Sequence, residues 1–89
     1  MKETYHLIPS KVFLKDLKKL PADMKPKIEA ALLELKNDPY SGKNVKKLSS
    51  VDIGMWRLRI GEWRIRYDVA GKETRFHIIR HRKDVYRKK

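Results

Sequence analysis

The residues best suited to chemistry in this sequence are arginines that alternate with apolar side chains over residues 56–67. On a β-strand, successive side chains point to opposite faces of the sheet. The two runs of this stretch, separated by Gly61 and Glu62, therefore predict a β-hairpin with apolar side chains on one face and cationic ones on the other. The arginines gathered on one face are Arg57, Arg59, Arg64 and Arg66. Like charges at cross-strand distance repel each other, so this face favours a polyanionic partner.

The distribution of charge supports the same expectation. The formal net charge of the 89 residues is +12. Residues 1–43 contain nine lysines against six acids, whereas residues 44–89 contain fourteen lysines and arginines against five acids, including all eight arginines. The planar guanidinium group suits bidentate contact with phosphate. The composition therefore predicts a nucleic acid, an anionic membrane surface or an acidic protein as partner.

Composition also excludes several classes of protein. The sequence has no cysteine, which excludes disulfides and thiolate metal sites. The three histidines, His6, His77 and His81, are not spaced like metal ligands, and we expect neither a metal nor another cofactor. The length predicts one domain over residues 1–89. No apolar run is long enough for a signal peptide or a bilayer span, so we expect a cytoplasmic protein that does not enter a membrane.

The first half of the chain predicts a strand and two helices that would position the hairpin. Residues 4–8 read as a strand ended by Pro9, and Ser10 is placed to cap a helix that reaches about residue 20. A second helix is expected from around residue 22 or 23 to about residue 37, with Pro26 in its first turn. Helical spacing gives each helix an apolar stripe. The stripes are Phe13, Leu14, Leu17 and Leu20, and Ile28, Ala31, Leu32 and Leu35.

The second half predicts a turn at residues 38–42, a basic loop over residues 43–54, the hairpin and a last strand over residues 74–80. In the last strand, period-two alternation puts Phe76 and Ile78 on one face and His77 and Ile79 on the other. We expect residues 81–89 to form a short turn of helix. The predicted fold is α+β in the order β-α-α-β-β-β, with the helical hairpin packed on one face of a mainly antiparallel sheet.

Two motifs in this order resemble the RelE/ParE toxin superfamily, and the resemblance covers essentially the whole chain. They are Trp-Arg-Leu-Arg-Ile-Gly-Glu-Trp-Arg-Ile-Arg-Tyr at residues 56–67 and His-Arg-Lys-Asp-Val-Tyr-Arg at residues 81–87. The resemblance implies a RelE-like toxin of a type II toxin-antitoxin pair, with a cognate antitoxin as partner and no DNA contact except through an antitoxin complex. RelE-like members cleave mRNA in the A site of the 70S ribosome, whereas ParE-like members inhibit DNA gyrase.

Carried onto matching positions, the resemblance implies a catalytic set drawn from Arg57, Arg59, Arg64, Arg80 or Arg82, and Tyr86. From these and the neighbouring cations we assign the expected roles. The residues expected to be catalytic are Arg59, Arg64, Arg82 and Tyr86. The residues expected to bind RNA are Arg57, Arg66, Arg80 and His81, together with Lys46 and Lys47 of the basic loop. The best-known members have lysines at the positions of Arg57 and Arg59, and this departure matters because arginine, with a pKa above about 12, is a poor proton acceptor.

The chemistry of RNA cleavage sets the roles that these residues must fill. Attack by the 2′-hydroxyl requires removal of its proton, stabilisation of a dianionic phosphorus and protonation of the 5′-oxygen. Fixed guanidinium groups can supply the second need without a metal. Proton transfer falls to Tyr86 or to His81, whose ordinary pKa is about 6.5. The resemblance favours Tyr86, whereas the chemistry alone leaves both open.

Other interpretations compete with this one. A gyrase inhibitor, or a relative that only binds its antitoxin, would have no chemical need for Arg64, Arg82 and Tyr86. A plain RNA-binding domain is disfavoured because no recognised RNA-binding motif is present. Several candidate residues also have structural interpretations. Trp56 and Trp63 share the register of the apolar core face, and His6 and His77 are expected to be structural. Arg66 and Arg75 can pair across strands with Asp68 or Glu73.

Overall fold

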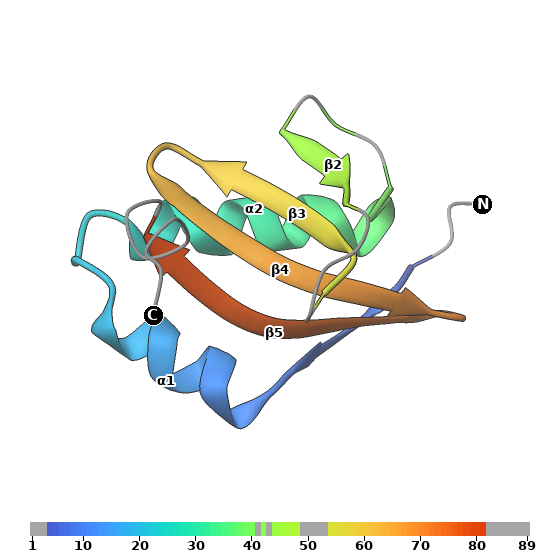
Figure 1. The fold of residues 1–89 in the computed structure, drawn as a ribbon, viewed down its shortest axis with the longest axis horizontal. Helices are drawn as coiled ribbons and strands as arrows, with labels where there is room; N and C mark the ends of the chain where they lie inside the picture. The colour runs from blue at the N-terminus through green and yellow to red at the C-terminus, as the bar shows by residue number, and fades with distance from the viewer. Residues whose placement is uncertain (1–3, 41, 43, 49–53, 82–89) are drawn as a thin grey trace.

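The computed structural model describes residues 4–40, 42, 44–48 and 54–81, and its strands form one five-stranded sheet of order β1-β5-β4-β3-β2 (Figure 1). β1 pairs with β5 in parallel, and the other neighbours are antiparallel. The elements are β1 (His6–Pro9), α1 (Lys11–Lys19), α2 (Lys25–Asn37), β2 (Val45–Lys47), β3 (Trp56–Ile60), β4 (Trp63–Ala70) and β5 (Glu73–His81). The predicted α+β class is confirmed.

Ser10 joins the end of β1 to the start of α1. Its Oγ accepts a hydrogen bond from the Phe13 N–H at 3.0 Å, which makes it the predicted N-cap. The same hydroxyl donates to the His77 carbonyl at 2.9 Å, and the Ser10 N–H donates to the Phe76 carbonyl at 3.0 Å. The cap therefore fixes the first turn of α1 against the edge of β5.

α2 begins at Lys25, later than the predicted start around residue 22 or 23, and ends at Asn37 as predicted. Pro26 lies in the first turn, where its missing N–H leaves no helical hydrogen bond unmade. Ile28 and Leu35 are buried, and Ala31 and Leu32 pack against the core. The predicted apolar stripe of α2 is confirmed. In α1, by contrast, Leu14 is 44% exposed and lies outside the stripe.

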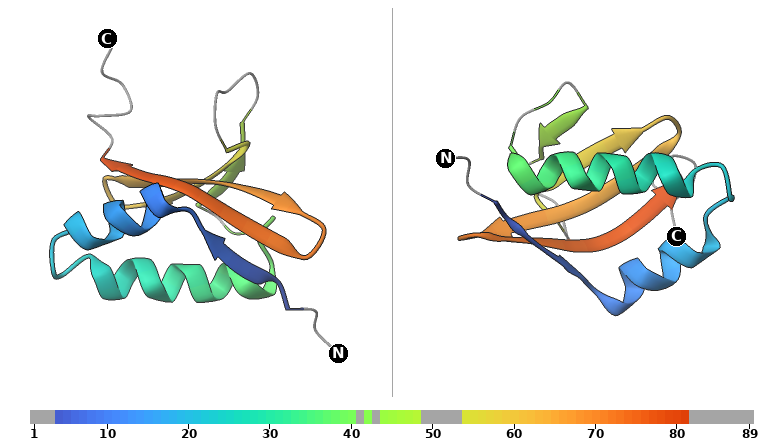
Figure 2. Two further views of the ribbon diagram at one scale, coloured as in Figure 1. Left: turned by 90° about the horizontal axis from the view of Figure 1, so that it is seen from below. Right: turned by 180° about the vertical axis from the view of Figure 1, so that it is seen from behind.

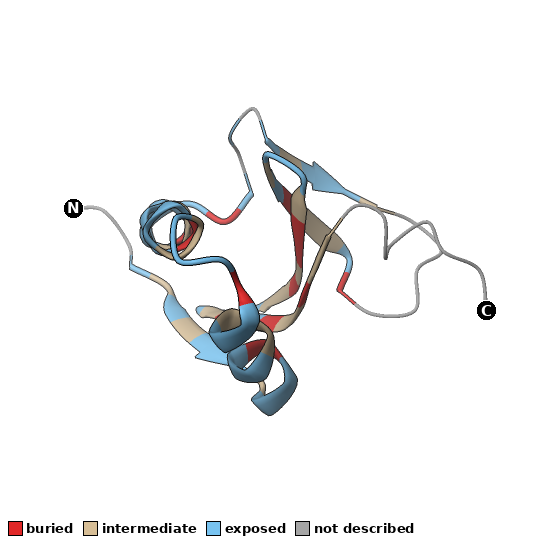
Figure 3. Cartoon of the chain, turned by 90° about the vertical axis from the view of Figure 1, so that its left-hand side faces the viewer, coloured by how far each residue is buried: buried red, intermediate tan, exposed pale blue. Residues whose placement is uncertain are grey.

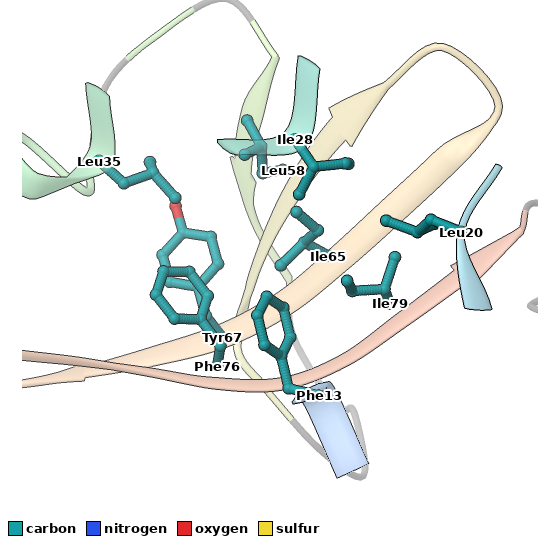
Figure 4. Packing of buried hydrophobic residues seen from close by; sticks show 9 residues of the cluster. All are labelled: Phe13, Leu20, Ile28, Leu35, Leu58, Ile65, Tyr67, Phe76 and Ile79. Atoms are coloured by element: carbon teal, nitrogen blue, oxygen red, sulfur yellow. The ribbon is translucent and has the colours of Figure 1, made fainter. Parts of the chain in front are cut away.

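The core lies between the sheet and the two helices, which cover the same face of the sheet (Figure 2). Its side chains converge from both helices and from three strands (Figure 4). Phe13 and Phe76 stack with ring centroids 5.1 Å apart, and the Tyr67 hydroxyl donates to the Pro39 carbonyl at 2.6 Å. The nine buried members are Phe13, Leu20, Ile28, Leu35, Leu58, Ile65, Tyr67, Phe76 and Ile79. Figure 3 shows that these buried positions line the inside of the layers, whereas the outer sides of the helices are exposed.

The hairpin forms as the alternation predicts. β3 and β4 are antiparallel, with Leu58 opposite Ile65 and Arg59 opposite Arg64. Trp56 and Trp63 are half-buried and pack against the core, which confirms their predicted register. The pairing puts the apolar set on the helix side and the cationic set on the other side.

Two details of the sheet differ from prediction. Val45–Lys47, expected within a loop, forms β2 and pairs with β3, so the sheet has one strand more than the predicted order. In β5, a bulge at the Arg66/Tyr67 pairing shifts the register, with Arg66 opposite Ile78 and Tyr67 opposite Phe76. The predicted grouping of Phe76 with Ile78 was therefore wrong. Phe76 and Ile79 are the pair that is buried in the core, because the bulge inserts one residue into the alternation.

Candidate functional site

The face of the sheet that points away from the helices gathers the arginines of the hairpin. Strand register sets Arg59 of β3 directly opposite Arg64 of β4, and Arg64 directly opposite Arg80 of β5. Directly opposed residues of antiparallel strands carry their side chains on one face, with Cβ atoms about 4.5–5.5 Å apart. We call Arg59, Arg64 and Arg80 the arginine row. The fold thus brings together two residues predicted to be catalytic and one predicted to bind RNA.

The three members of the arginine row have different environments. Arg59 is exposed, and within the described part of the chain no hydrogen bond or ion pair is found for its side chain. Arg64, in the middle, is only 8% exposed. Arg80 donates from Nη1 to Oδ2 of Asp16 at 2.5 Å. The row therefore combines an accessible cation, a nearly buried one and one held by a carboxylate. A charge shielded from water acts more strongly on its surroundings than an exposed one.

A second cationic line runs beside the arginine row, with Lys46 opposite Arg57 and Arg57 opposite Arg66. Arg66 donates from Nε to the Gly54 carbonyl at 3.1 Å. This hydrogen bond holds the backbone at Gly54, just before β3, against β4. Gly54 has φ +68°, and a Cβ there would lie 2.8 Å from the Arg66 Cβ. Only glycine fits this close approach. The Lys47 ammonium lies 6.0 Å from the centre of the Trp56 ring.

Asp68 links the start of β3 to β5 at the other end of this face. Its Oδ1 accepts from the Met55 N–H at 2.8 Å, and its Oδ2 lies 2.9 Å from Nε2 of His77. Burial acts to raise the pKa of Asp68, but these two contacts and the nearby charges of His77 and Arg66 hold it below its ordinary value. His77 therefore has the structural position predicted for it. Further along β5, Arg75 pairs with Glu73, with Nη2 and Oε1 2.8 Å apart. Both residues belong to β5, so this pair lies within one strand and not across strands as predicted.

His81 lies on the helix side of the sheet. The register sets it opposite Trp63, which packs against the core, and the two rings meet edge to face with centroids 5.1 Å apart. The sheet therefore separates His81 from Arg59 and Arg64. An open groove of about 310 Å³ borders it, lined by Asp16, Lys19, Trp63, Ile79, Arg80 and His81.

Arg82 and Tyr86, both predicted to be catalytic, lie outside the described residues, as does the helical turn expected for the tail. Within the described part, no three His, Cys, Asp or Glu side chains are grouped so that they could hold a metal ion. None of the helices in that part is long and apolar enough to cross a membrane.

Residues 7–86 match the family described as the ParE toxin of the type II toxin-antitoxin system parDE. The chain belongs to the RelE/ParE toxin family. Among curated relatives of this toxin, Toxin RelE3 of Methanocaldococcus jannaschii is 30% identical over 80 residues, which span 86% of this chain and 90% of that protein.

Solved structures of RelE toxins share the fold. The toxin resembles a chain of the RelB-RelE antitoxin-toxin complex from Methanococcus jannaschii, with a TM-score of 0.73, 28% identity, and coverage of 89% of this chain and 94% of that one. It also resembles a chain of the archaeal RelE-RelB complex from Pyrococcus horikoshii, with a TM-score of 0.77, 25% identity, and coverage of 89% and 96%. These likenesses confirm the predicted RelE-like fold of the toxin.

Asp16, which contacts Arg80 of the arginine row in this toxin, was not identified from the sequence. The carboxylate lies among lysines and reads as part of a solvated helix face. The signal was its spacing, because Phe13, Asp16 and Leu17 follow the i, i+3, i+4 pattern that turns side chains toward the core.

Proposed function

We propose that this toxin is a ribosome-dependent endoribonuclease that cuts mRNA in the ribosomal A site. The observation that carries the proposal is the arginine row, in which Arg59 and Arg64 lie in direct register on the open face of the sheet. Like charges in direct register repel each other, and an RNA phosphate relieves that repulsion. Because ribosomes act in the cytoplasm, the proposal also places the toxin there.

The environments of the two arginines suit different parts of the reaction. Arg59 is exposed and accessible to a phosphate oxygen. Arg64 is nearly buried, so its charge is fixed in place and less screened by water. Preorganised positive charge directed at a developing dianion is commonly the largest contribution to catalysis. In the proposed reaction, Arg59 and Arg64 stabilise the crowded phosphorus that forms when the 2′-hydroxyl attacks.

Proton transfer is assigned to Tyr86 rather than to His81. His81 lies on the helix side of the sheet, opposite Trp63, and the sheet separates it from the phosphate that Arg59 would hold. The resemblance to RelE-like toxins gives Tyr86 the proton-transfer role and Arg82 a further contact with the phosphate. In the proposed reaction, the Tyr86 phenolate takes the proton of the 2′-hydroxyl, and the resulting phenol gives that proton to the departing 5′-oxygen. The arginines meet the remaining need, so the proposal includes no metal.

A cognate antitoxin is the proposed protein partner. The solved relatives from Methanococcus jannaschii and Pyrococcus horikoshii are toxin-antitoxin complexes. The net charge of +12 makes an acidic polypeptide the natural complement of this toxin. In this proposal the antitoxin covers the cationic face and relieves its repulsion until the toxin is released.

The test is primer extension on a reporter mRNA in a reconstituted translation reaction, with and without ribosomes. The parent should produce cuts within A-site codons only when ribosomes are present. Arg64→Ala and Tyr86→Phe should reduce those cuts strongly, whereas Lys15→Gln, on an exposed part of α1, should leave them unchanged. Uncut mRNA together with normal translation by the parent would contradict the proposal.

The family description names ParE, which makes inhibition of DNA gyrase the second candidate. A gyrase inhibitor needs a binding surface but no proton-transfer group. Supercoiling by purified gyrase in the presence of the toxin separates the two candidates. Inhibition of supercoiling that survives Tyr86→Phe, with mRNA left intact, would favour the ParE-like activity.

A further inference from the structure

Asp16 of α1 makes contacts with β5 that tie the helix to the arginine row. Its Oδ2 accepts a hydrogen bond from the Ile79 N–H at 2.9 Å and another from Nη1 of Arg80 at 2.5 Å. The same Nη1 donates to the Ile79 carbonyl at 3.0 Å. These three bonds hold the end of the Arg80 side chain at the edge of β5, beside α1.

The Asp16–Arg80 pair is more shielded than an ordinary surface ion pair. The Asp16 side chain is 14% exposed and that of Arg80 is 37% exposed. The Arg75–Glu73 pair at the other end of β5 has side-chain exposures of 56% and 42%. Exposed pairs contribute little, because water and salt screen them. The pair at Asp16 therefore acts as a fixed feature of the structure rather than as an incidental contact.

The backbone of Arg80 lies in the arginine row, but its charged guanidinium group is bound elsewhere. Its backbone register is directly opposite Arg64, within the arginine row. Its guanidinium is bound instead to a carboxylate of α1, which packs at the edge of β5. Without Asp16, three guanidinium groups would lie along one line across adjacent strands, which is unfavourable in the absence of an anion.

We propose that Asp16 is a positioning residue that competes with RNA phosphate for Arg80. In the free toxin, Asp16 holds Arg80 away from the open face. When RNA reaches Arg59 and Arg64, a phosphate oxygen competes with the carboxylate for Arg80 and displaces it in part of the complexes. The inference rests on the proposed function, because it takes RNA as the ligand of the arginine row.

The chemistry of the groups makes this exchange feasible. Carboxylate and phosphate oxygens both accept charge-assisted hydrogen bonds from the guanidinium fork. After Arg80 leaves, Oδ2 of Asp16 still accepts a hydrogen bond from the Ile79 N–H, because the backbone of β5 holds that N–H in place. The carboxylate is therefore not left buried without a partner, which would otherwise make the exchange costly.

The test is the salt dependence of binding to a single-stranded RNA oligonucleotide, measured by fluorescence anisotropy over a NaCl series. Asp16→Asn keeps an oxygen acceptor for the Ile79 N–H and removes the charge that holds Arg80. It should tighten binding at 0.1 M NaCl about fivefold and steepen the slope of log K against log[NaCl] by up to about 0.7, the value for one full phosphate contact on a single strand, because the parent makes that contact only in those complexes in which phosphate has displaced the carboxylate.

Two control variants isolate the role of Arg80. Glu29→Gln makes the same change in net charge at an exposed position on α2, on the covered side of the sheet. It should leave the slope at the parent value. In an Arg80→Ala background, Asp16→Asn should change binding no more than Glu29→Gln does. Urea unfolding of each variant confirms that every comparison uses folded protein.

The inference is overturned if Asp16→Asn has the slope of Glu29→Gln, or if it weakens binding as Arg80→Ala does. Its failure is distinguishable from failure of the proposed function. Equal slopes with ribosome-dependent cuts intact would remove the role of Asp16 alone. A steeper slope for Asp16→Asn with uncut mRNA would remove the nuclease and keep the competition for Arg80.

Discussion

The two faces of the β3–β4 hairpin are built from the same strands and have opposite physical characters. On the helix side, Ile65 and Tyr67 are fully buried. On the open side, their immediate neighbours Arg64 and Arg66 lie among other cations. Period-two alternation along each strand separates the two sets. One face stabilises the fold by burial, whereas the other gathers like charges, among which Arg66 and Asp68 also hold the chain that leads into β3.

This difference separates stability from function within single strands. Burial of apolar area on the helix side supplies the favourable free energy of folding. On the open face, repulsion between like charges at cross-strand distance, such as Arg59 and Arg64, opposes folding. The comparison predicts that substitutions at successive positions of β4 have unlike effects, with loss of stability at one residue and loss of activity at the next.

The largest change in stability is expected at Ile65, which is fully buried at the centre of the core. Ile65→Ala should lower the free energy of unfolding by about 3–4 kcal/mol, because it removes buried methyl groups and leaves a cavity. Urea denaturation measures this, and Ile8→Ala, at a position that is 41% exposed, should cost under about 0.5 kcal/mol. Similar losses at both positions would remove the distinction between the faces.

The next effect is on activity, at Arg59. Arg59→Gln should reduce the rate of ribosome-dependent mRNA cleavage about 100-fold, which corresponds to about 2.7 kcal/mol of transition-state stabilisation. The free energy of unfolding should stay the same or rise slightly, because a repulsive charge is removed. Single-turnover cleavage and urea denaturation of one preparation give both quantities. If Arg59→Gln cleaves mRNA normally but unfolds more easily, Arg59 serves stability and not activity, which contradicts the role assigned to the open face.

A smaller effect concerns Asp68, the acidic residue beside the cations. Its pKa lies below the ordinary value in the folded protein, so its charge contributes stability above about pH 4. That contribution is lost as the pH falls through the folded pKa. Asp68→Asn should lower the free energy of unfolding at pH 7 by about 0.5 kcal/mol, since the side chain is 39% exposed and therefore screened.

The pH dependence of this difference is the check. Parent and Asp68→Asn should converge in urea denaturation as the pH falls below about 4, where the carboxylate becomes protonated. A difference that stays constant down to pH 2.5 would show that the charge of Asp68 contributes nothing.

The sequence predicted most of the fold because its strongest patterns are local. The arginine-apolar alternation specified both hairpin strands and their faces, and Ser10 marked the start of α1 where the structure has it. The predicted start of α2 was too early, although Pro26 does lie in its first turn. β2 was missed because a three-residue strand that ends in two lysines has no recognisable alternation. It is defined by pairing with β3, which is a long-range interaction.

The site was less predictable, for related reasons. The bulge in β5 depends on how two strands pair, so alternation alone put Ile79 on the wrong face. The contact of Asp16 with Arg80 joins residues that are 64 positions apart in the sequence. The position of His81 behind the sheet follows from the pairing of β4 with β5. Local patterns predict which residues share a face of one strand, but not which partners meet them.

The central claim is that repulsion between the cations of the open face destabilises the free toxin and that an anion relieves this repulsion. The smallest expected effect tests this claim most directly. The measurement is the melting temperature of the free toxin between 0.02 and 0.3 M NaCl. Salt screens repulsion between exposed charges, so the melting temperature should rise by about 2–4 °C, and by about half as much in Arg59→Gln. Lys15→Gln, which removes a charge from the helix side, should keep the full rise. A melting temperature that falls with added salt, or an equal rise in both variants, would contradict the account.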